Sequence, residues 1–305
     1  MPPSSATSAR SGRHTLSRAA EEGQLASRLQ WAWTFCFLSS YLHVVVFPNL
    51  AYRLYYRAFS ATGGYRLPDH GFELLPNVDV SAYKDIPLFV LLGCCLVMLI
   101  MPFFIHPAGY TTPGWFVVPG AARTFCVYFL SQWLRSACYL STPLPGSGPH
   151  CLGALPPPPE RWVDGLFAVR SQEHCCGDLM FSGHMATALT ACCCLSKYFQ
   201  NCFGLSDLQN RWARAVWWLL AALEAVLIVV SRQHYTVDVV VSLYTTPLVW
   251  AYSEHVWPDD IVPVRNGATS TSLDLKVKAM LGALVALSYH AATSMHWNGA
   301  HAASG

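Results

Sequence analysis

Residues 213–256 read ARAVWWLLAALEAVLIVVSRQHYTVDVVVSLYTTPLVWAYSEHV and decide the fold class. Two apolar blocks, at about Ala213 to Val230 and Val237 to Val256, flank a short polar segment that carries His234 and Asp238. Each block approaches the ~20 residues that an α-helix needs to cross a bilayer. The stretch therefore predicts two membrane-spanning helices with a polar junction at one membrane surface.

Apolar blocks of the same kind recur upstream, at about Trp31 to Leu50, Ile86 to Ile105, Trp115 to Leu140 and Leu179 to Phe199. Of the 305 residues, 53% are hydrophobic and only 12% are charged, against about a quarter in an ordinary soluble domain. The sequence predicts an all-α, polytopic membrane protein with six transmembrane helices. A shorter apolar stretch near Ala279 to Ala292 is expected to form an amphipathic or reentrant helix, or a seventh span.

These blocks divide the chain into three parts. Residues 1–28 are expected to form a disordered cytoplasmic tail, residues 29–258 the six-helix catalytic domain, and residues 259–305 a C-terminal tail. Lys and Arg are more frequent on the side of the N-terminus, which favours a cytoplasmic N-terminus. The net charge of +2 is small and the basic residues are spread along the chain, without the concentrated basic face that nucleic-acid binding needs. Nucleic acid is therefore not an expected partner.

Polar clusters stand at the ends of the predicted spans, where function is expected in a membrane protein. They are Leu67-Pro68-Asp69, Arg135 with Thr142 and Pro145, the segment from Cys176 to His184, and the segment from Ser231 to Asp238. Counting the crossings puts all of these clusters on one side of the membrane, the non-cytoplasmic side.

Two histidines are the candidate catalytic groups. His234 and Asp238 are four residues apart, so on a helix their side chains share one face, and the carboxylate would fix the imidazole tautomer for nucleophilic or base chemistry. His184 follows Ser182 and Gly183 at a helix start, where backbone amides hold anions such as phosphate.

Two arginines and three further polar residues complete the predicted site. Arg135 and Arg232 are candidates to clamp phosphate oxygens with their forked donors. Asp178, Tyr235 and Asp69 belong to the same polar clusters and are expected to support the catalytic groups.

Cys151, Cys175 and Cys176 fall in one loop between spans. If that loop faces an oxidising lumen, Cys151 can pair with Cys175 or Cys176, and free thiols are the alternative. No cysteine and histidine spacing typical of structural zinc is present, so no metal or cofactor is expected.

With these clusters in order, the chain resembles the sphingolipid synthase family within the lipid phosphate phosphatase superfamily. The residues that carry the resemblance are LPD at 67–69, the R-x6-T-x-L-P pattern from Arg135 to Pro145, CGD-x-x-FSGH at 176–184 and HYT-x-DV at 234–239. The superfamily's upstream K-x6-R-P motif is absent, so Arg135 or Arg232 is expected to hold the phosphate.

The resemblance implies a lipid phosphate phosphatase-like helical bundle whose active site faces the lumen of the Golgi or another endomembrane. It implies transfer of a headgroup phosphate from a glycerophospholipid to the primary hydroxyl of ceramide, with His234 as nucleophile, Asp238 orienting it and His184 as acid and then base. The stretch from Ser231 to Val241 and the pair His184-Met185 are similar to plant and protozoal inositol phosphorylceramide synthases. Phosphatidylinositol is therefore the expected donor, with sphingomyelin or ceramide phosphoethanolamine synthesis as the alternative.

Other classes of protein fit the same residues. A lipid phosphatase would use water as acceptor, a zinc-dependent membrane hydrolase would use His184, His234 and Asp238 as ligands, and a transporter would use the His/Asp pair as a proton relay.

Overall fold

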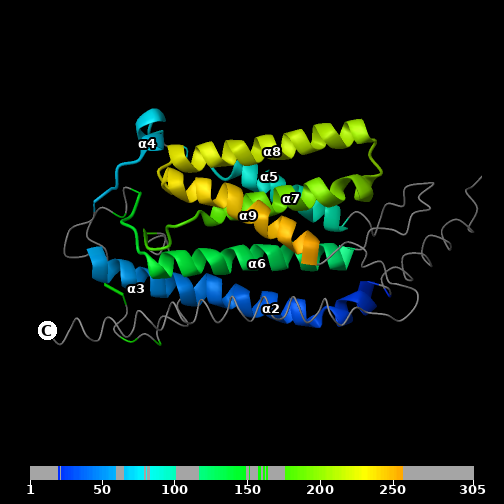
Figure 1. Ribbon diagram of the computed structural model, residues 1–305, viewed down its shortest axis with the longest axis horizontal. Helices are drawn as coiled ribbons and strands as arrows, with labels where there is room; N and C mark the ends of the chain where they lie inside the picture. The colour runs from blue at the N-terminus through cyan, green and yellow to red at the C-terminus, as the bar shows by residue number, and fades with distance from the viewer. Residues whose placement is uncertain are drawn as a thin grey trace, which may run out of the picture.

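A computed structural model describes residues 20, 22–59, 65–78, 80, 83–100, 117–148, 151, 157–158, 161, 163 and 176–256. Every regular element in these ranges is helical, which agrees with the all-α prediction. The long helices lie roughly alongside one another in an elongated bundle (Figure 1).

A long N-terminal helix covers one side of the bundle. It comprises α2 (Gln30–Tyr41), the π-helical turn η1 (Leu42–Val46) and α3 (Phe47–Phe59), which follow one another without a break. Figure 1 shows α2 and α3 running along α6 (Val117–Ser141). Single π-helical turns inside α-helices are uncommon and are often found at functional sites.

The remaining helices surround α7 (Gly183–Phe203), which contacts all of its long neighbours: α5 (Ile86–Ile100), α6, α8 (Asp207–Val230) and α9 (Thr236–Val256). Apolar side chains and thiols of α7 form the centre of the largest core cluster, among them Leu189, Cys192 and Leu195. The cysteine run of α7 therefore packs as small apolar residues. The short helix α4 (His70–Leu74) lies at the same end of the bundle as the start of α7 and the start of α9.

The connections between helices carry clear start and stop signals. Ser206 and Gln209 form a reciprocal capping box at the start of α8. The preceding helix, α7, ends at Gly204, whose φ of 64° is the left-handed conformation that glycine adopts without penalty. These signals make the α7–α8 connection short, so the two helices pack antiparallel.

Except for the short α4, the helices overlap the six predicted apolar blocks. Within the described ranges, two helical stretches are long and apolar enough to cross a membrane, Gln30–Phe59 and Asp207–Val230, and Ile86–Ile100 is a shorter apolar helix.

The predicted boundary of the N-terminal tail needs a correction. Residues 22–28 are helical rather than disordered. The buried Glu22 carboxylate accepts hydrogen bonds from the amides of Val117 and Val118, which ties this segment to the start of α6. The C-terminal tail and the stretch from Ala279 to Ala292 lie outside the described residues.

Candidate functional site

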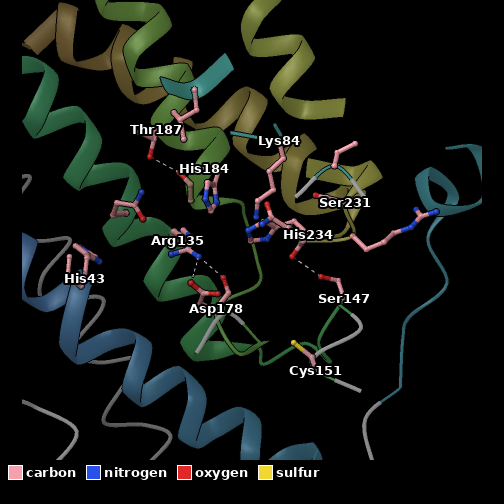
Figure 2. A pocket seen from close by; sticks show the side chains of 18 of the residues that line it. His43, Lys84, Arg135, Ser147, Cys151, Asp178, His184, Thr187, Ser231 and His234 are labelled. Carbon is pink, nitrogen blue, oxygen red and sulfur yellow. Dashed lines mark hydrogen bonds and ion pairs between the residues drawn. The ribbon is translucent and has the colours of Figure 1, made fainter. Parts of the chain in front are cut away.

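A cavity of about 1090 Å³ opens at the end of the bundle where α4 and the starts of α7 and α9 meet. His184 and His234 both line it, although they are 50 positions apart in the sequence. Figure 2 shows the two rings in the same cavity, His184 on α7 and His234 in the turn that precedes α9. The structure thus brings the two predicted histidines together.

His234 is held by a buried carboxylate. Its Nδ1 lies 3.3 Å from Oδ2 of Asp238, whose side chain is fully buried. The same oxygen accepts a hydrogen bond from the Tyr235 amide, and Oδ1 accepts one from the Met180 amide. Asp238 therefore fixes the imidazole and also joins the two motif segments, which leaves Nε2 of His234 as the nitrogen available for chemistry.

The two motif segments both contain strained backbone. Met180 (φ 73°) and Arg232 (φ 58°) are the non-glycine residues with positive φ in the described ranges. Side chains other than glycine rarely adopt this conformation, and such residues cluster at functional sites when the surrounding structure enforces them. Each lies within a few residues of a candidate catalytic histidine.

His184 is the more exposed histidine, with 42% of its side chain accessible. Its Nε2 lies 3.9 Å from Oδ1 of Asp85, too far for a hydrogen bond but close enough for an ion pair. Asp85 immediately precedes α5. Each histidine of the site therefore has a neighbouring carboxylate, and only that of His234 is in hydrogen-bond contact.

Arg135 ties α6 to the loop that precedes α7. Its guanidinium donates to the Asp178 carboxylate at 2.6 Å and to the carbonyl oxygens of Asp178 and Phe181. Burial disfavours the charged Asp178 carboxylate, but the guanidinium of Arg135 and the nearby His234 hold its pKa below the ordinary value. Arg135 lines the cavity, and most of its donors already position the loop.

Gly183 makes room for this arginine. A Cβ at residue 183 would lie 3.3 Å from Cζ of Arg135 and 3.6 Å from Nη1. The backbone of Gly183 is helical and has no positive φ. The close approach of the guanidinium thus explains the glycine at this position.

Two residues predicted to bind phosphate have other contacts. Ser182 is fully buried, and its hydroxyl caps α7 by accepting from the Met185 amide. Arg232 donates to the carbonyl oxygens of Phe72 and Leu75 and lies 4.3 Å above the Phe72 ring. Ser182 therefore shapes the start of α7, and Arg232 anchors α4 at the rim of the cavity.

Asp69 and Tyr235 hold the cavity wall. The Asp69 carboxylate accepts from the Phe72 amide at the start of α4 and from the Thr236 amide and hydroxyl at the start of α9. The Tyr235 hydroxyl donates to the Pro145 carbonyl and accepts from the Leu67 amide. One carboxylate thus caps two helices, and one phenol connects two loops.

A disulfide joins Cys151 to Cys176, with their Cα atoms 5.6 Å apart. Of the two pairings that the sequence left open, the structure contains this one, and Cys175 lies outside the described residues. The bridge ties the loop after α6 to the segment that leads to His184, next to Tyr55, which donates to the Cys151 carbonyl.

Sequence reasoning missed several polar residues of the cavity. Lys84 is directed toward the histidines (Figure 2), and its ammonium has no ion-pair or hydrogen-bond partner in the part of the chain that the structure describes. His43 and Gln132 also line the cavity. Neither Lys84 nor His43 belongs to a recognisable motif. Only their polar side chains, at or near the end of a predicted span, could have indicated a place in the site.

No group of three or more His, Cys, Asp or Glu side chains in the described ranges is arranged to hold a metal ion.

Comparisons with known proteins agree with the motifs. Residues 175–256 match a family model described as PAP2 superfamily C-terminal. The chain is 30% identical over 210 residues to phosphatidylinositol:ceramide inositolphosphotransferase 3 of Arabidopsis thaliana, covering 64% of this chain and 66% of that protein. It is 31% identical over 211 residues to the phosphatidylinositol:ceramide inositolphosphotransferase of Oryza sativa subsp. indica, covering 67% and 60%.

A shorter similarity extends to the human phosphatidylcholine:ceramide cholinephosphotransferase 2, with 29% identity over 135 residues, which covers 41% of this chain and 35% of that protein. The matched regions thus span at most about two-thirds of the length of these relatives. No solved structure matches the chain significantly. On these matches and on the motifs around its two cavity histidines, the chain belongs to the sphingolipid synthase family.

Proposed function

We propose that this protein is a phosphatidylinositol:ceramide phosphoinositol transferase. The observation that carries the proposal is that His184 and His234 line one cavity while a buried carboxylate orients His234. Relatives whose names specify this transfer are similar over about two-thirds of this chain, whereas the match to the human choline transferase covers 41% of it. This difference favours inositol phosphate over choline phosphate as the transferred group.

In the proposed first step, Nε2 of His234 attacks the phosphorus of the donor lipid. The P–O bond to the glycerol breaks as the P–N bond forms, and His184 donates its proton to the departing diacylglycerol oxygen. Asp238 stabilises the positive charge that develops on His234. The product of this step is diacylglycerol and a phosphohistidine.

In the second step, His184, now neutral, removes the proton of the ceramide primary hydroxyl. The hydroxyl oxygen attacks phosphorus, the P–N bond breaks, and His234 returns to its starting state. His184 is partly exposed, and the Asp85 carboxylate lies 3.9 Å from its Nε2, within ion-pair distance.

Lys84 and Arg135 are proposed to neutralise the phosphate. Both line the cavity, and Lys84 carries an ammonium with no partner among the described groups. Arg135 contributes mainly through the loop that it holds. Lys84 thus supplies the positive charge that the missing K-x6-R-P motif would otherwise provide.

The proposal includes six membrane crossings, with the cavity on the luminal side of the Golgi or another endomembrane. The support is that every loop of the site lies at one end of the bundle, as alternating crossings require, and that a disulfide fits an oxidising compartment.

The direct test is His234→Ala in isolated membranes supplied with fluorescent ceramide. We expect loss of transfer, whereas His255→Ala, which removes an exposed histidine at the other end of α9, retains it. Substantial activity in His234→Ala would rule out His234 as the nucleophile.

A second experiment separates the donors and the reaction classes. Purified protein is given phosphatidylinositol, phosphatidylcholine and phosphatidylethanolamine together with ceramide, and the products are identified by mass. Inositol phosphorylceramide is expected. Choline or ethanolamine phosphorylceramide would reassign the donor, free phosphate without ceramide consumption would indicate a phosphatase, and loss of activity on chelation that zinc restores would indicate a zinc hydrolase.

A further inference from the structure

The wall of the cavity formed by η1 and α6 contains an imidazole that the proposed chemistry does not use. His43 lies in the π-helical turn and lines the cavity together with Gln132 and Ser40. Its Nε2 is buried and has no hydrogen-bond partner among the described residues. A buried, unsatisfied ring nitrogen costs free energy, so it is kept where a ligand can satisfy it.

The orientation of the ring is fixed. Nδ1 of His43 lies 3.0 Å from the Ser136 hydroxyl. The ring packs edge-on against Trp133, with ring centroids 5.2 Å apart, and at a tilt against Phe47, with centroids 5.0 Å apart. Aromatic contacts of this kind hold a ring in one rotamer. His43 is therefore preorganised, and Nε2 is the nitrogen without a protein partner.

The hydrogen bonds of Ser136 determine which nitrogen of His43 carries the proton. The hydroxyl donates its one proton to the Gln132 carbonyl oxygen, which can only accept. Ser136 must then accept from its other two partners, the Tyr139 hydroxyl and Nδ1 of His43. Because Nδ1 carries the proton in the neutral ring, Nε2 is a lone-pair acceptor that requires a donor.

The two lipid substrates differ in the donors that they offer beside the reacting oxygen. Ceramide has a secondary hydroxyl and an amide N–H next to its primary hydroxyl. Diacylglycerol has only ester oxygens in the corresponding region, and these accept but do not donate. A lone pair facing an ester oxygen leaves both groups unsatisfied, so an acceptor at this position favours ceramide.

The position of His43 agrees with such a role. Gln132 precedes Arg135 by three residues, which places it ~4.5 Å further along α6, away from the end that carries the phosphate-binding groups. The amide of Gln132 provides both a donor and an acceptor, and it has no hydrogen-bond partner in the described ranges. The pair is thus placed for the polar segment of a lipid whose hydroxyl reaches the histidines.

We infer that His43 and Gln132 form an acceptor-recognition subsite, in which Nε2 of His43 accepts a hydrogen bond from the amide N–H or the secondary hydroxyl of ceramide. This inference rests on the proposed transferase function. It assigns His43 to the selection of ceramide over diacylglycerol, and it gives the π-helical turn a reason, because the turn sets the register of His43 on the cavity wall.

The test compares ceramide with N-methylceramide and 3-deoxyceramide, each of which retains the primary hydroxyl. Wild-type protein is expected to lose about tenfold in kcat/KM with at least one analogue, mainly through KM. His43→Phe is expected to lose about the same factor with ceramide and to stop discriminating against that analogue. KM for the phospholipid donor should not change.

His43→Gln, whose amide oxygen can accept, should recover part of the discrimination, and His255→Phe is the matched control outside the cavity. Equal use of all three acceptors by wild-type protein, or unchanged discrimination in His43→Phe, would overturn the subsite. If His43→Phe does not fold, the wild-type comparison and His43→Gln decide. Absence of transfer to ceramide by wild-type protein would instead refute the proposed function, so the two failures are distinguishable.

Discussion

Asp238 makes more contacts than orienting a histidine requires. Its carboxylate contacts Nδ1 of His234 and the amides of Met180 and Tyr235, so it holds the His234 ring and both motif segments at once. An amide side chain is nearly the same size, but it replaces one acceptor oxygen with a donor. Replacing Asp238 with Asn therefore tests the negative charge and the second acceptor oxygen with little change in side-chain volume.

Asp238→Asn is expected to reduce transfer by roughly 10²- to 10⁴-fold, because the amide no longer stabilises the positive charge on His234 and favours the wrong tautomer. Initial rates of fluorescent ceramide conversion measure the loss. Asp207→Asn, at the start of α8 and away from the cavity, is the matched control. Activity within threefold of wild type in Asp238→Asn would show that the carboxylate is not part of the reaction.

Lys84 provides a second test at the scale of one residue. Replacement by Met keeps the apolar stem and removes the ammonium, so KM for phosphatidylinositol should rise roughly tenfold while KM for ceramide changes little, consistent with loss of one charge-assisted contact. Lys84→Arg should retain most of the affinity because the charge remains. A rise in the KM of ceramide alone would place Lys84 on the acceptor instead.

At the scale of elements, helix starts define the site. Asp69 caps α4 and α9 together, so the LPD segment far upstream in the sequence fixes the helix that follows His234. Burial disfavours the Asp69 carboxylate, but hydrogen bonds from the hydroxyl and amide of Thr236 and from the Phe72 amide outweigh it and lower the pKa. The Asp69 carboxyl group is therefore protonated at a lower pH in the folded protein than in the unfolded chain.

Asp69→Ala is expected to lower the free energy of unfolding by about 1–2 kcal/mol at neutral pH, since helix caps are lost at two helices. A carboxyl with a lowered pKa contributes fully above its unfolded pKa of about 4, and the contribution disappears as the pH falls through the folded value. The difference in Tm between wild type and Asp69→Ala should therefore be largest at pH 7 and shrink below about pH 4. A difference that grows on acidification would contradict this linkage.

The sequence predicted the positions of the long helices, because apolar blocks are a local pattern. His234 and Asp238 are in contact, but His234 lies in the turn before α9 and not on the helix that their four-residue spacing predicted. The sequence did not predict that Arg232 donates to the carbonyl oxygens of Phe72 and Leu75, or that Lys84 and His43 line the cavity. Those contacts depend on which loops and helices meet in space, and a single sequence does not contain that information.

At the scale of the whole molecule, the disulfide connects parts of the site that no helix joins. Cys151 and Cys176 are 25 positions apart, and the bridge holds the loop after α6 against the approach to α7. Closing a loop of this length stabilises a folded protein by about 3 kcal/mol in the chain-entropy description. The bridge is therefore expected to matter most for the stability of the catalytic end.

Cys151→Ser combined with Cys176→Ser is expected to lower the Tm and to make the wild-type sensitivity to dithiothreitol disappear. Thermal unfolding in detergent, with and without the reductant, measures both effects. Cys138→Ser is the control, since its thiol is free and lies on α6. An unchanged Tm in the double variant would show that the bridge does not stabilise the folded state.

If the helices cross a membrane alternately, as proposed, the two ends of the bundle lie in different compartments. The loop that contains Pro157 and Pro158 follows α6 at the catalytic end, whereas the turn at Gly204 lies at the opposite end. The sequence contains no Asn-x-Ser/Thr site, so an inserted N-glycosylation site reports its own location without background. A site inserted between Pro157 and Pro158 should be glycosylated, and the same insert after Gly204 should not, as a mobility shift that an endoglycosidase removes. The reverse pattern would invert the orientation and place the cavity on the cytoplasmic side. Glycosylation at both positions would show that α7 does not cross the membrane. The proposed site would then lose its basis, because His184 and His234 reach one membrane surface only if the helices between them cross alternately.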